Sequence, residues 1–279
     1  MKFYRIKKDE KEFIAVSKDG KKLMSVDYDN MIELVREIGT NNLPEFKQGM
    51  VFDISDVTVL SPVKKPIHDI LCVGVNYRDH REESKSLNHV KESADTVYFS
   101  KRTVNILGDN EFLPDLSVYD NSFDYEVELA VIIGKDCKDV SEEDAENYIF
   151  GYSIFNDGSV RNVQTRHQQW YKGKSFDGGC VMGPCIVHKS EIAYPPCLDV
   201  QTKVNGEVRQ NSNTSLFIHT ISQIIAEFSR GTSLEAGDII ITGTPAGVGM
   251  GFKPPIFLKS GDKIEMTIEN IGKLTNIVK

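Results

Sequence analysis

The sequence has little cysteine, and none of it is paired at short spacing. The five cysteines (Cys72, Cys137, Cys180, Cys185 and Cys197) are an odd number and form no C-x-x-C pair. A chain of 279 residues can bury a substantial core and does not need disulfides to stay folded. We therefore expect reduced cysteines and a cytoplasmic protein.

Long apolar runs and excess positive charge are also missing. No stretch approaches the ~18 to 20 apolar residues that a membrane helix requires, and the start, MKFYRIKKDEKEF, is charged without the apolar run of a secretory signal. The whole chain has 33 basic residues and 41 acidic ones, for a formal charge of -8. Nucleic acids and anionic membranes usually meet clustered Lys and Arg, so we expect neither partner. The acidic balance leaves carboxylates available for a divalent cation.

Nucleotide-binding motifs are missing as well. The glycines of GTPAGVGMG, residues 243–251, resemble a phosphate loop only superficially, because no Gly-Lys-Ser/Thr ends the loop. No G-x-G-x-x-G opens a helix either. We therefore exclude nucleotide binding at this loop.

The chain divides into a small N-terminal domain, residues 1–65, and a larger domain, residues 66–279. The first part predicts short strands at KFYRI and EFIAVS, a turn at Asp19-Gly20 and a helix over NMIELVREIG that ends at Gly39. SPVKKPIHD then supplies two prolines and charge, which is typical of a linker.

The larger part alternates strands and turns with few helices. VSEEDAENYIFGY predicts a helix with a Ser N-cap that ends at Gly151, and SLFIHTISQIIAEFSRG predicts another that closes at Gly231. GDIIITGTPAGVG and GDKIEMTIENIG predict strands bounded by glycine turns. A mainly-β, α+β fold is therefore expected rather than a doubly wound sheet.

Two glutamates stand side by side in an apolar strand, FDYEVELAVIIG, residues 123–134. Side chains alternate along a strand, so Glu126 and Glu128 share one face. Their like charges repel unless something compensates, and a cation shared with Asp157, at the end of GYSIFNDG, would do so. Carboxylates without His or Cys favour Mg²⁺ or Mn²⁺. On spacing alone, the solvent face of an edge strand is the favoured alternative.

A histidine and a glutamate are three residues apart in NYRDHREES. In a helix, His80 and Glu83 are neighbours on one face, so the carboxylate could orient the imidazole for proton transfer. The alternative is an exposed polar helix whose charges only contact solvent, and it is favoured for an isolated H-x-x-E.

A lysine lies in the turn-rich run QWYKGKSFDGGCVMGP. Lys174 could reach into a site and hold an anionic substrate or a developing oxyanion, although most lysines in such turns are solvated. Trp170, the single tryptophan, is interpreted as a packing residue.

Taken in order, these motifs resemble the fumarylacetoacetate hydrolase family over roughly residues 68–279. The motifs are GVNYRDHREES, FDYEVELAVIIGK, GYSIFNDGSVRNVQ, QWYKGKSFD with MGP, VNGEVRQNSNTS and GDIIITGTPAGVGMGFKPPIFLKSGDKIE. The resemblance implies a mixed β-roll catalytic domain behind a small N-terminal α+β domain, usually in a homodimer. It reverses the preference for the simpler alternatives above.

The resemblance also implies roles for individual residues. Mg²⁺ or Mn²⁺ would be bound by three carboxylates, which fall on Glu126, Glu128 and Asp157. A lid dyad falls on His80 and Glu83, within a segment around residues 77–98 that we expect to close over substrate. The active-site lysine falls on Lys174, and Gln164 and Thr244 match positions that help to hold a 2-oxo-carboxylate.

Some positions depart from the family pattern. Gly158 and Asn162 stand near the expected metal site, Arg102 occupies a place where proline is common, and Cys185 one where tryptophan is common. None of these changes removes an expected ligand, but they leave the substrate open.

The expected function is metal-dependent cleavage of a C–C bond in a small 2-oxo acid, as in an acylpyruvate hydrolase or an oxaloacetate decarboxylase. One alternative is an isomerase, dehydratase or hydratase of a related 2-oxo acid, such as the 2-hydroxyhepta-2,4-diene-1,7-dioate type, because the same enolate can be reprotonated elsewhere or expel a hydroxyl. Another is a non-catalytic metabolite-binding protein, which would require a broken ligand set.

Overall fold

The structure, a computed structural model, describes residues 1–40, 43–46, 49–85 and 96–279. Within these ranges the chain is mostly sheet, as the mainly-β prediction requires. No helix in them is long and apolar enough to cross a membrane. All five cysteines are free, as predicted.

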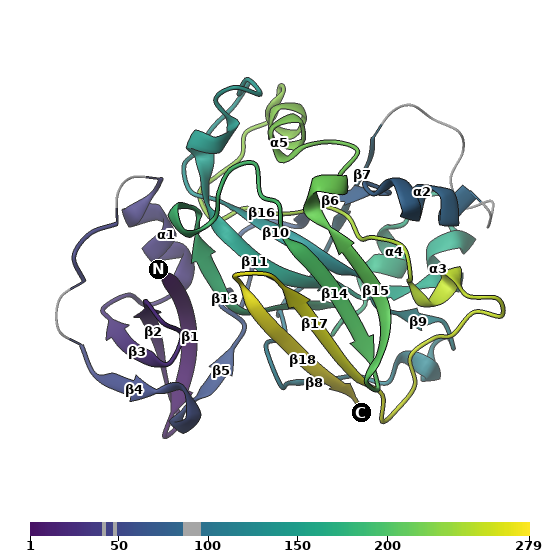
Figure 1. Cartoon of the computed structure of the whole chain (residues 1–279), viewed down its shortest axis with the longest axis horizontal. Coiled ribbons are helices and arrows are strands. Elements are labelled where there is room, and N and C mark those ends of the chain that lie inside the picture. The colour runs from purple at the N-terminus through teal and green to yellow at the C-terminus, as the bar shows by residue number, and fades with distance from the viewer. Residues whose placement is uncertain (41–42, 47–48, 86–95) are drawn as a thin grey trace.

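One long sheet runs through the molecule (Figure 1). In the described part it has eleven strands, of which ten follow one another across the sheet and β5 pairs with β1. In spatial order they are β4 (Val51–Asp53), β3 (Lys22–Val26), β2 (Lys11–Ser17), β1 (Lys2–Lys8), β13 (Cys180–His188), β11 (Ile149–Asp157), β10 (Val127–Ile133), β16 (Ile239–Ile241), β6 (Ile70–Gly74) and β7 (Val97–Lys101), with β5 (Thr58–Leu60).

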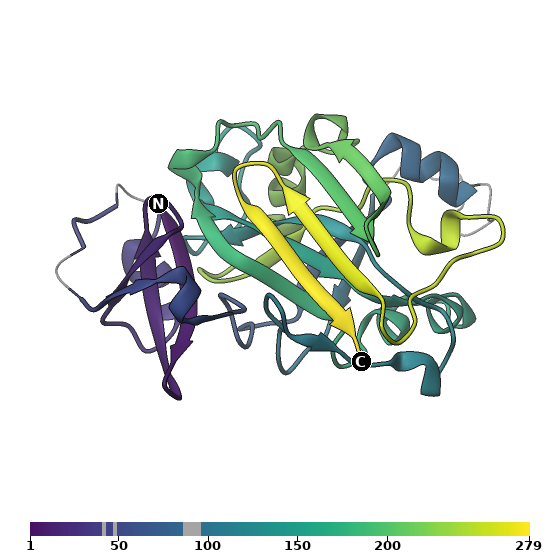
Figure 2. The ribbon, with the colours of Figure 1, turned by 60° about the horizontal axis from the view of Figure 1, so that its bottom comes forward.

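A second sheet lies against the middle of the first, and its yellow strands cross the front of the molecule in Figure 2. Its described strands are β15 (Glu207–Asn213), β14 (Asp199–Val204), β17 (Lys263–Ile268), β18 (Gly272–Val278) and β8 (Phe112–Leu113). A short pair joins β9 (Phe123–Asp124) to β12 (Ser159–Val160).

Helices are short and lie outside the sheets. They are α1 (Met31–Ile38), α2 (Arg78–Lys85), α3 (Arg161–Arg166), α4 (Tyr171–Lys174) and α5 (Ile221–Ser229). The 3-10 turns are η1 (Ile54–Asp56), η2 (Leu116–Val118), η3 (Ala145–Tyr148), η4 (Lys189–Glu191), η5 (Thr214–Leu216) and η6 (Gly249–Gly251). Helices α2, α3 and α4 gather at the end of the molecule away from the N-terminus, on the right of Figure 1.

The N-terminal strands and α1 form where the sequence predicts them. The Asn30 side chain caps α1 by accepting from the N–H of Glu33, and the helix ends at Gly39 as expected. The N-terminal strands are nevertheless continuous with the main sheet, because β1 pairs antiparallel with β13. The boundary at residue 65 stays a prediction.

The predicted helix over residues 140–151 is wrong. Ser141 caps only a turn, accepting from the N–H of Asp144, and the 3-10 turn η3 follows. The apolar residues after Tyr148 then enter β11, where Gly151 pairs with His188. These residues are buried between β10 and β13, because pairing across the sheet outweighs a short local helix preference.

The second predicted helix is confirmed only in its last part. Residues 215–219 belong to η5 and the connection after it, and α5 begins at Ile221 with Thr220 as its N-cap. Thr220 and Gln223 form a capping box, which marks this start more strongly than the apolar spacing does. The strands predicted near residues 239 and 263 are present as β16 and β17.

Candidate active site

The two glutamates lie in the centre of the long sheet and not on an edge strand. Strand β10 pairs with β11 on one side and β16 on the other, and Glu126 and Glu128 are 4% and 2% exposed. The strand predicted over residues 123–134 is interrupted at residues 125 and 126, so Glu126 immediately precedes β10. The edge-strand alternative is therefore wrong.

Alternation along β10 places the glutamates on a distinct face. Tyr125, Val127 and Leu129 pack in the core that also contains the second sheet, whereas Ala130 and Ile132 pack in the other core, with α1. Even-numbered residues share that second face, so the glutamates extend it beyond its apolar part.

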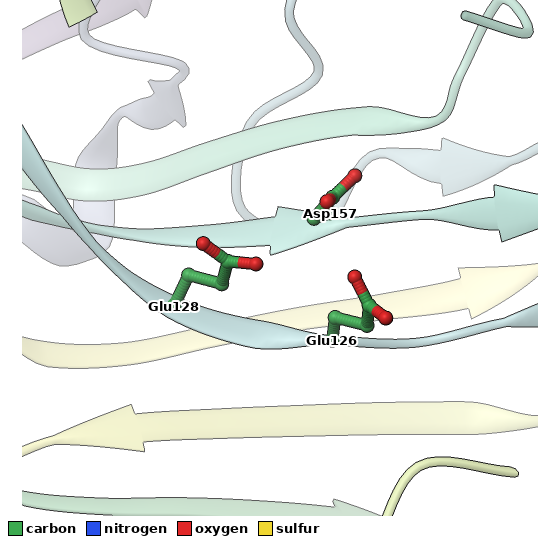
Figure 3. Close-up of side chains that lie close together, drawn as sticks. All are labelled: Glu126, Glu128 and Asp157. Atoms are coloured by element: carbon green, nitrogen blue, oxygen red, sulfur yellow. The ribbon is translucent and has the colours of Figure 1, made fainter. Parts of the chain in front are cut away.

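Asp157 joins them from the neighbouring strand β11 (Figure 3). Carboxylate oxygens of Glu126, Glu128 and Asp157 all lie within 4.8 Å of one another. The backbone holds this arrangement, because the N–H of Asp157 donates to the carbonyl of Glu126 at 2.9 Å. The Asn156 side chain in turn accepts from the N–H of Glu126 at 3.1 Å.

Three buried cations surround the acids. Lys174 Nζ lies 2.5 Å from Glu126 Oε2 and 2.6 Å from Asp157 Oδ2. Lys101 Nζ donates to Asp157 and to the carbonyl oxygens of Gly158 and Gly179. Arg161 pairs with Glu126 and Asp124. Lys174 is therefore buried beside the acids and is not a solvated turn residue; its active-site role stays a prediction.

These contacts neutralise the acids unequally. Burial alone would raise the pKa of Glu126, but the charges of Arg161 and Lys174 hold that pKa below its usual value. Burial raises the pKa of Glu128 well above its usual value, and the charges of Asp157 and Glu126 add to that rise. Among the described residues, no Lys or Arg forms a salt bridge with Glu128. Its Oε2 accepts instead from the N–H of Gly243 at 2.5 Å.

This donor set fits a divalent metal ion. Three buried carboxylates converge, and hard oxygen donors are what Mg²⁺ and Mn²⁺ prefer. A cation beside Glu128 would also offset the charge that the lysines and the arginine leave uncompensated. Glu126, Glu128 and Asp157 are therefore the candidate ligands.

The His-Glu pair forms as predicted. Both residues lie on α2, and His80 Nδ1 is 2.8 Å from Glu83 Oε2. His80 is only 6% exposed, so the exposed-helix alternative is wrong. Residues 86–95 of the expected lid lie outside the described residues.

One cavity collects most of the predicted residues. Glu126, Glu128, His80, Gln164, Lys174 and Thr244 line it, together with Arg161 and Trp170. Gly173 allows α4 to lie directly against α3, because a Cβ there would be 2.4 Å from Gln164 N. Lys174 and Gln164 are thereby brought side by side. Trp170 packs edge-on against Phe99, at 5.3 Å between ring centroids, as well as lining the cavity.

Arg161 and Lys101 were not predicted as site residues. Arg161 is 4% exposed and also donates from Nη1 to Gln164 Oε1 at 3.1 Å. Its spacing of three residues before Gln164 on one helix was a usable indication. Lys101 ends the strand VYFSK and gives no such pattern. Asn162, one of the departures from the family, donates to Asp120 and not into the cavity.

The family assignment rests on a direct match. The family model described as fumarylacetoacetate (FAA) hydrolase C-terminal matches residues 69–279. The chain belongs to the fumarylacetoacetate hydrolase family. Oxaloacetate tautomerase YisK of Bacillus subtilis is 46% identical over 226 residues, which cover 81% of this chain and 74% of that protein.

Solved structures of this family share the whole fold. A fumarylacetoacetate hydrolase of Exiguobacterium antarcticum superposes with a TM-score of 0.88 at 38% identity, covering 100% of this chain and 99% of that chain. A 2-hydroxyhepta-2,4-diene-1,7-dioate isomerase of Mycobacterium marinum gives 0.79 at 32% identity, with 100% and 98% covered. A maleylpyruvate hydrolase of Sphingobium sp. SYK-6, in complex with manganese(II) and pyruvate, gives 0.77 at 28%, with 100% and 98% covered.

Proposed function

We propose that this chain is an enzyme that enolises a small 2-oxo acid and transfers its proton, as in the keto–enol tautomerisation of oxaloacetate. The observation that carries the proposal is one cavity lined by Glu126, Glu128, two basic side chains and His80, whose imidazole contacts Glu83 behind it at 2.8 Å. The name of the Bacillus subtilis relative, which is 46% identical, supports the tautomerase reaction.

The basic and amide side chains would hold the substrate's carboxylate and 2-oxo oxygen. Gln164 Oε1 accepts from Arg161, which leaves its amide N–H groups to donate. Thr244 Oγ1 accepts from Gln210 at 2.7 Å, so its own O–H can donate to the substrate. Lys174 would stabilise negative charge that develops on the 2-oxo oxygen.

A metal ion completes the proposed site. Glu126, Glu128 and Asp157 would hold Mg²⁺ or Mn²⁺, and the bound ion would act as a Lewis acid for the enolate charge. The manganese in the Sphingobium hydrolase supports this choice of metal. Lys174 contacts two of these carboxylates, so its position depends on the same acids.

His80 would move the proton. Its Nδ1 is held by Glu83, so Nε2 is the nitrogen that takes a proton from substrate carbon and returns it to the substrate. The Glu83 carboxylate would offset the positive charge of the imidazolium that forms when His80 takes the proton. Tautomerisation moves one proton between carbon and oxygen, so the substrate neither gains nor loses atoms.

Cleavage of a C–C bond, which the sequence alone placed first, is the second candidate. His80 would then take a proton from water as the water attacks the distal carbonyl, and Lys174 would stabilise the oxyanion. Pyruvate in the Sphingobium maleylpyruvate hydrolase favours this candidate. Isomerisation of a 2-hydroxyhepta-2,4-diene-1,7-dioate type substrate uses the same proton transfer, and the Mycobacterium marinum isomerase favours it.

A panel assay separates these candidates. The purified protein with Mg²⁺ or Mn²⁺ is given oxaloacetate and several acylpyruvates, and enol absorbance and pyruvate release are both followed. Loss of enol without pyruvate supports the tautomerase, and metal-dependent pyruvate supports cleavage. Activity must vanish in the double variant Glu126→Gln/Glu128→Gln. Bound metal without turnover of any compound would favour a metabolite-binding protein.

Replacing His80 with Asn tests the division of roles. Turnover should fall by about 10²- to 10⁴-fold, the usual contribution of a general acid–base group, while Mn²⁺ affinity stays within about threefold because His80 is not a candidate ligand. Quenching of Trp170, which lines the cavity, reports Mn²⁺ binding. The exposed His167 supplies the control, His167→Asn, with unchanged turnover. A large loss of Mn²⁺ affinity in His80→Asn would contradict these roles.

A further inference from the structure

One carboxylate holds both the catalytic histidine candidate and a glycine loop. Glu83 Oε2 contacts His80 Nδ1 at 2.8 Å, and Glu83 Oε1 accepts from the N–H of Gly247 at 3.0 Å. Gly247 belongs to the loop of residues 243–251, which carries Thr244 into the cavity. The position of α2 over the site is therefore tied to the position of this loop.

Two glycines of this loop lie so close to Glu83 and to the second sheet that neither has space for a side chain. Gly247 has φ +98°, and a Cβ there would be 1.9 Å from the carbonyl oxygen of Arg209. A Cβ on Gly251 would be 1.9 Å from Glu83 Oε1. Small movements of Gly247 would therefore change the place that Glu83 occupies.

Two residues just before β10, Asp124 and Tyr125, form hydrogen bonds with this loop. The Tyr125 hydroxyl donates to the carbonyl of Gly247 at 2.9 Å, and Asp124 accepts from the N–H groups of Gly249 and Met250. Tyr125 is 1% exposed, and it is absent from the described residues that line the cavity. Its side chain points away from the face that carries Glu126.

We propose that Tyr125 is a positioning residue for the His80–Glu83 pair. Its hydroxyl holds Gly247 so that the N–H of Gly247 keeps Glu83, and through Glu83 the imidazole of His80, in place over the site. The same stretch of chain thereby supplies a candidate metal ligand, Glu126, and positions His80, which lines the same cavity. The catalytic part of this inference rests on the proposed function.

The test is Tyr125→Phe, which removes the hydroxyl and keeps the ring. Tyr194→Phe is the matched control, because it removes another hydroxyl hydrogen bond, 2.6 Å to Ser222 Oγ, away from α2. Hydrogen exchange measured by mass spectrometry on residues 78–85 should be about five- to tenfold faster in Tyr125→Phe, the effect of one lost hydrogen bond. The control should match the wild type there.

Kinetics provide the second measurement. In Tyr125→Phe, kcat should fall about five- to tenfold while KM and Mn²⁺ affinity stay within about twofold, since the group acts on His80 and not on the ligands. Unchanged exchange of α2 in Tyr125→Phe, or equal acceleration in both variants, would overturn the inference. If the wild type turns over no 2-oxo acid, the proposed function fails, and the exchange measurement still decides the role of Tyr125.

Discussion

Glu128 is a buried carboxylate that no lysine or arginine of the described ranges pairs with directly. Its neighbour Glu126 contacts both Lys174 and Arg161. The surroundings therefore lower the pKa of Glu126 and raise the pKa of Glu128, although both residues are candidate metal ligands. Replacing each by glutamine, which keeps the shape and removes the charge, separates these responses.

In the metal-free protein, Glu128→Gln should leave the free energy of unfolding unchanged or raise it by up to about 1 kcal/mol. The substitution removes a carboxyl group whose charged form is disfavoured by burial, and the amide oxygen can still accept from Gly243. Glu126→Gln should lower the free energy of unfolding by about 2 to 4 kcal/mol, because two buried cations lose a partner.

Denaturant unfolding with and without Mn²⁺ provides the measurement. Both variants should lose most of the stabilisation that Mn²⁺ gives the wild type, since ligand binding to the folded state raises stability. Equal losses in the free energy of unfolding without metal would contradict this prediction. They would show that Glu128 is stabilised by neighbouring positive charge as strongly as Glu126 is.

The candidate site was predictable at some residues and not at others for physical reasons. Glu126, Glu128, His80 and Glu83 show local periodicity, since spacing of two on a strand or three on a helix brings side chains together. Arg161 is buried because Asp124 and Glu126 reach it from a segment more than 30 residues earlier in the chain. Such long-range pairing leaves little trace in local sequence.

At the scale of elements, the junction of β1 with β13 contains a buried histidine. His188 is 2% exposed, and its ring meets Phe150 edge-on at 5.4 Å between centroids. Its side chain also caps η4 by accepting from the N–H of Ser190. Burial lowers the pKa of His188 to about 4, and the positive charge of Lys189 contributes.

This pKa predicts acid sensitivity. The unfolded chain has the ordinary histidine pKa of about 6.5, so between about pH 6.5 and 4 it binds more protons than the folded state. The free energy of unfolding should therefore fall as the pH drops through this window, by at most about 3 kcal/mol, and should be constant above it with respect to His188.

The substitution His188→Asn should flatten that dependence, because Asn can still cap η4 but does not titrate. Unfolding midpoints from pH 4 to 8 provide the measurement. His68→Asn is the opposite control, since the bond to Asp238 raises the pKa of His68 and stabilises the protein most at low pH. An unchanged slope in His188→Asn would remove His188 as the cause.

Elements were predictable when their signals were strong and local. Helix α1 has an Asn cap, a Gly end and apolar spacing, and it forms as expected. The segment after Ser141 has a cap and acidic residues too, but Ile149 and Phe150 continue into a strand buried by neighbours on both sides. The pairing of β11 with β10 and β13 therefore outweighs the local helix propensity of this segment.

At the scale of the whole molecule, we predict a homodimer, as the family resemblance implies. Light scattering after size exclusion should give twice the chain mass of 31.4 kDa across a range of protein concentrations. A mass of 31.4 kDa at all concentrations would contradict this prediction. Cytoplasmic location likewise stays a prediction.

The mainly-β fold was predictable from composition and turns, but the continuity of the long sheet was not. The pairing of Lys2 with Val187 joins residues far apart in the chain. Sequence patterns identify strands and do not identify their partners at such separations. The sequence therefore predicted a separate N-terminal domain, whereas its strand β1 pairs with β13 of the larger part.

Glu128 and Asp157 lie on paired strands of the central sheet and Glu126 immediately precedes one of them, whereas His80 lies on α2 and is connected to a glycine loop through Glu83. If the proposed function holds, substitutions in α2 or the loop should change proton transfer without disturbing the strand pairing that holds the acids. Such a division between a fixed acidic centre and a separately held histidine is compatible with more than one reaction, and the similar proteins include a hydrolase, an isomerase and a tautomerase.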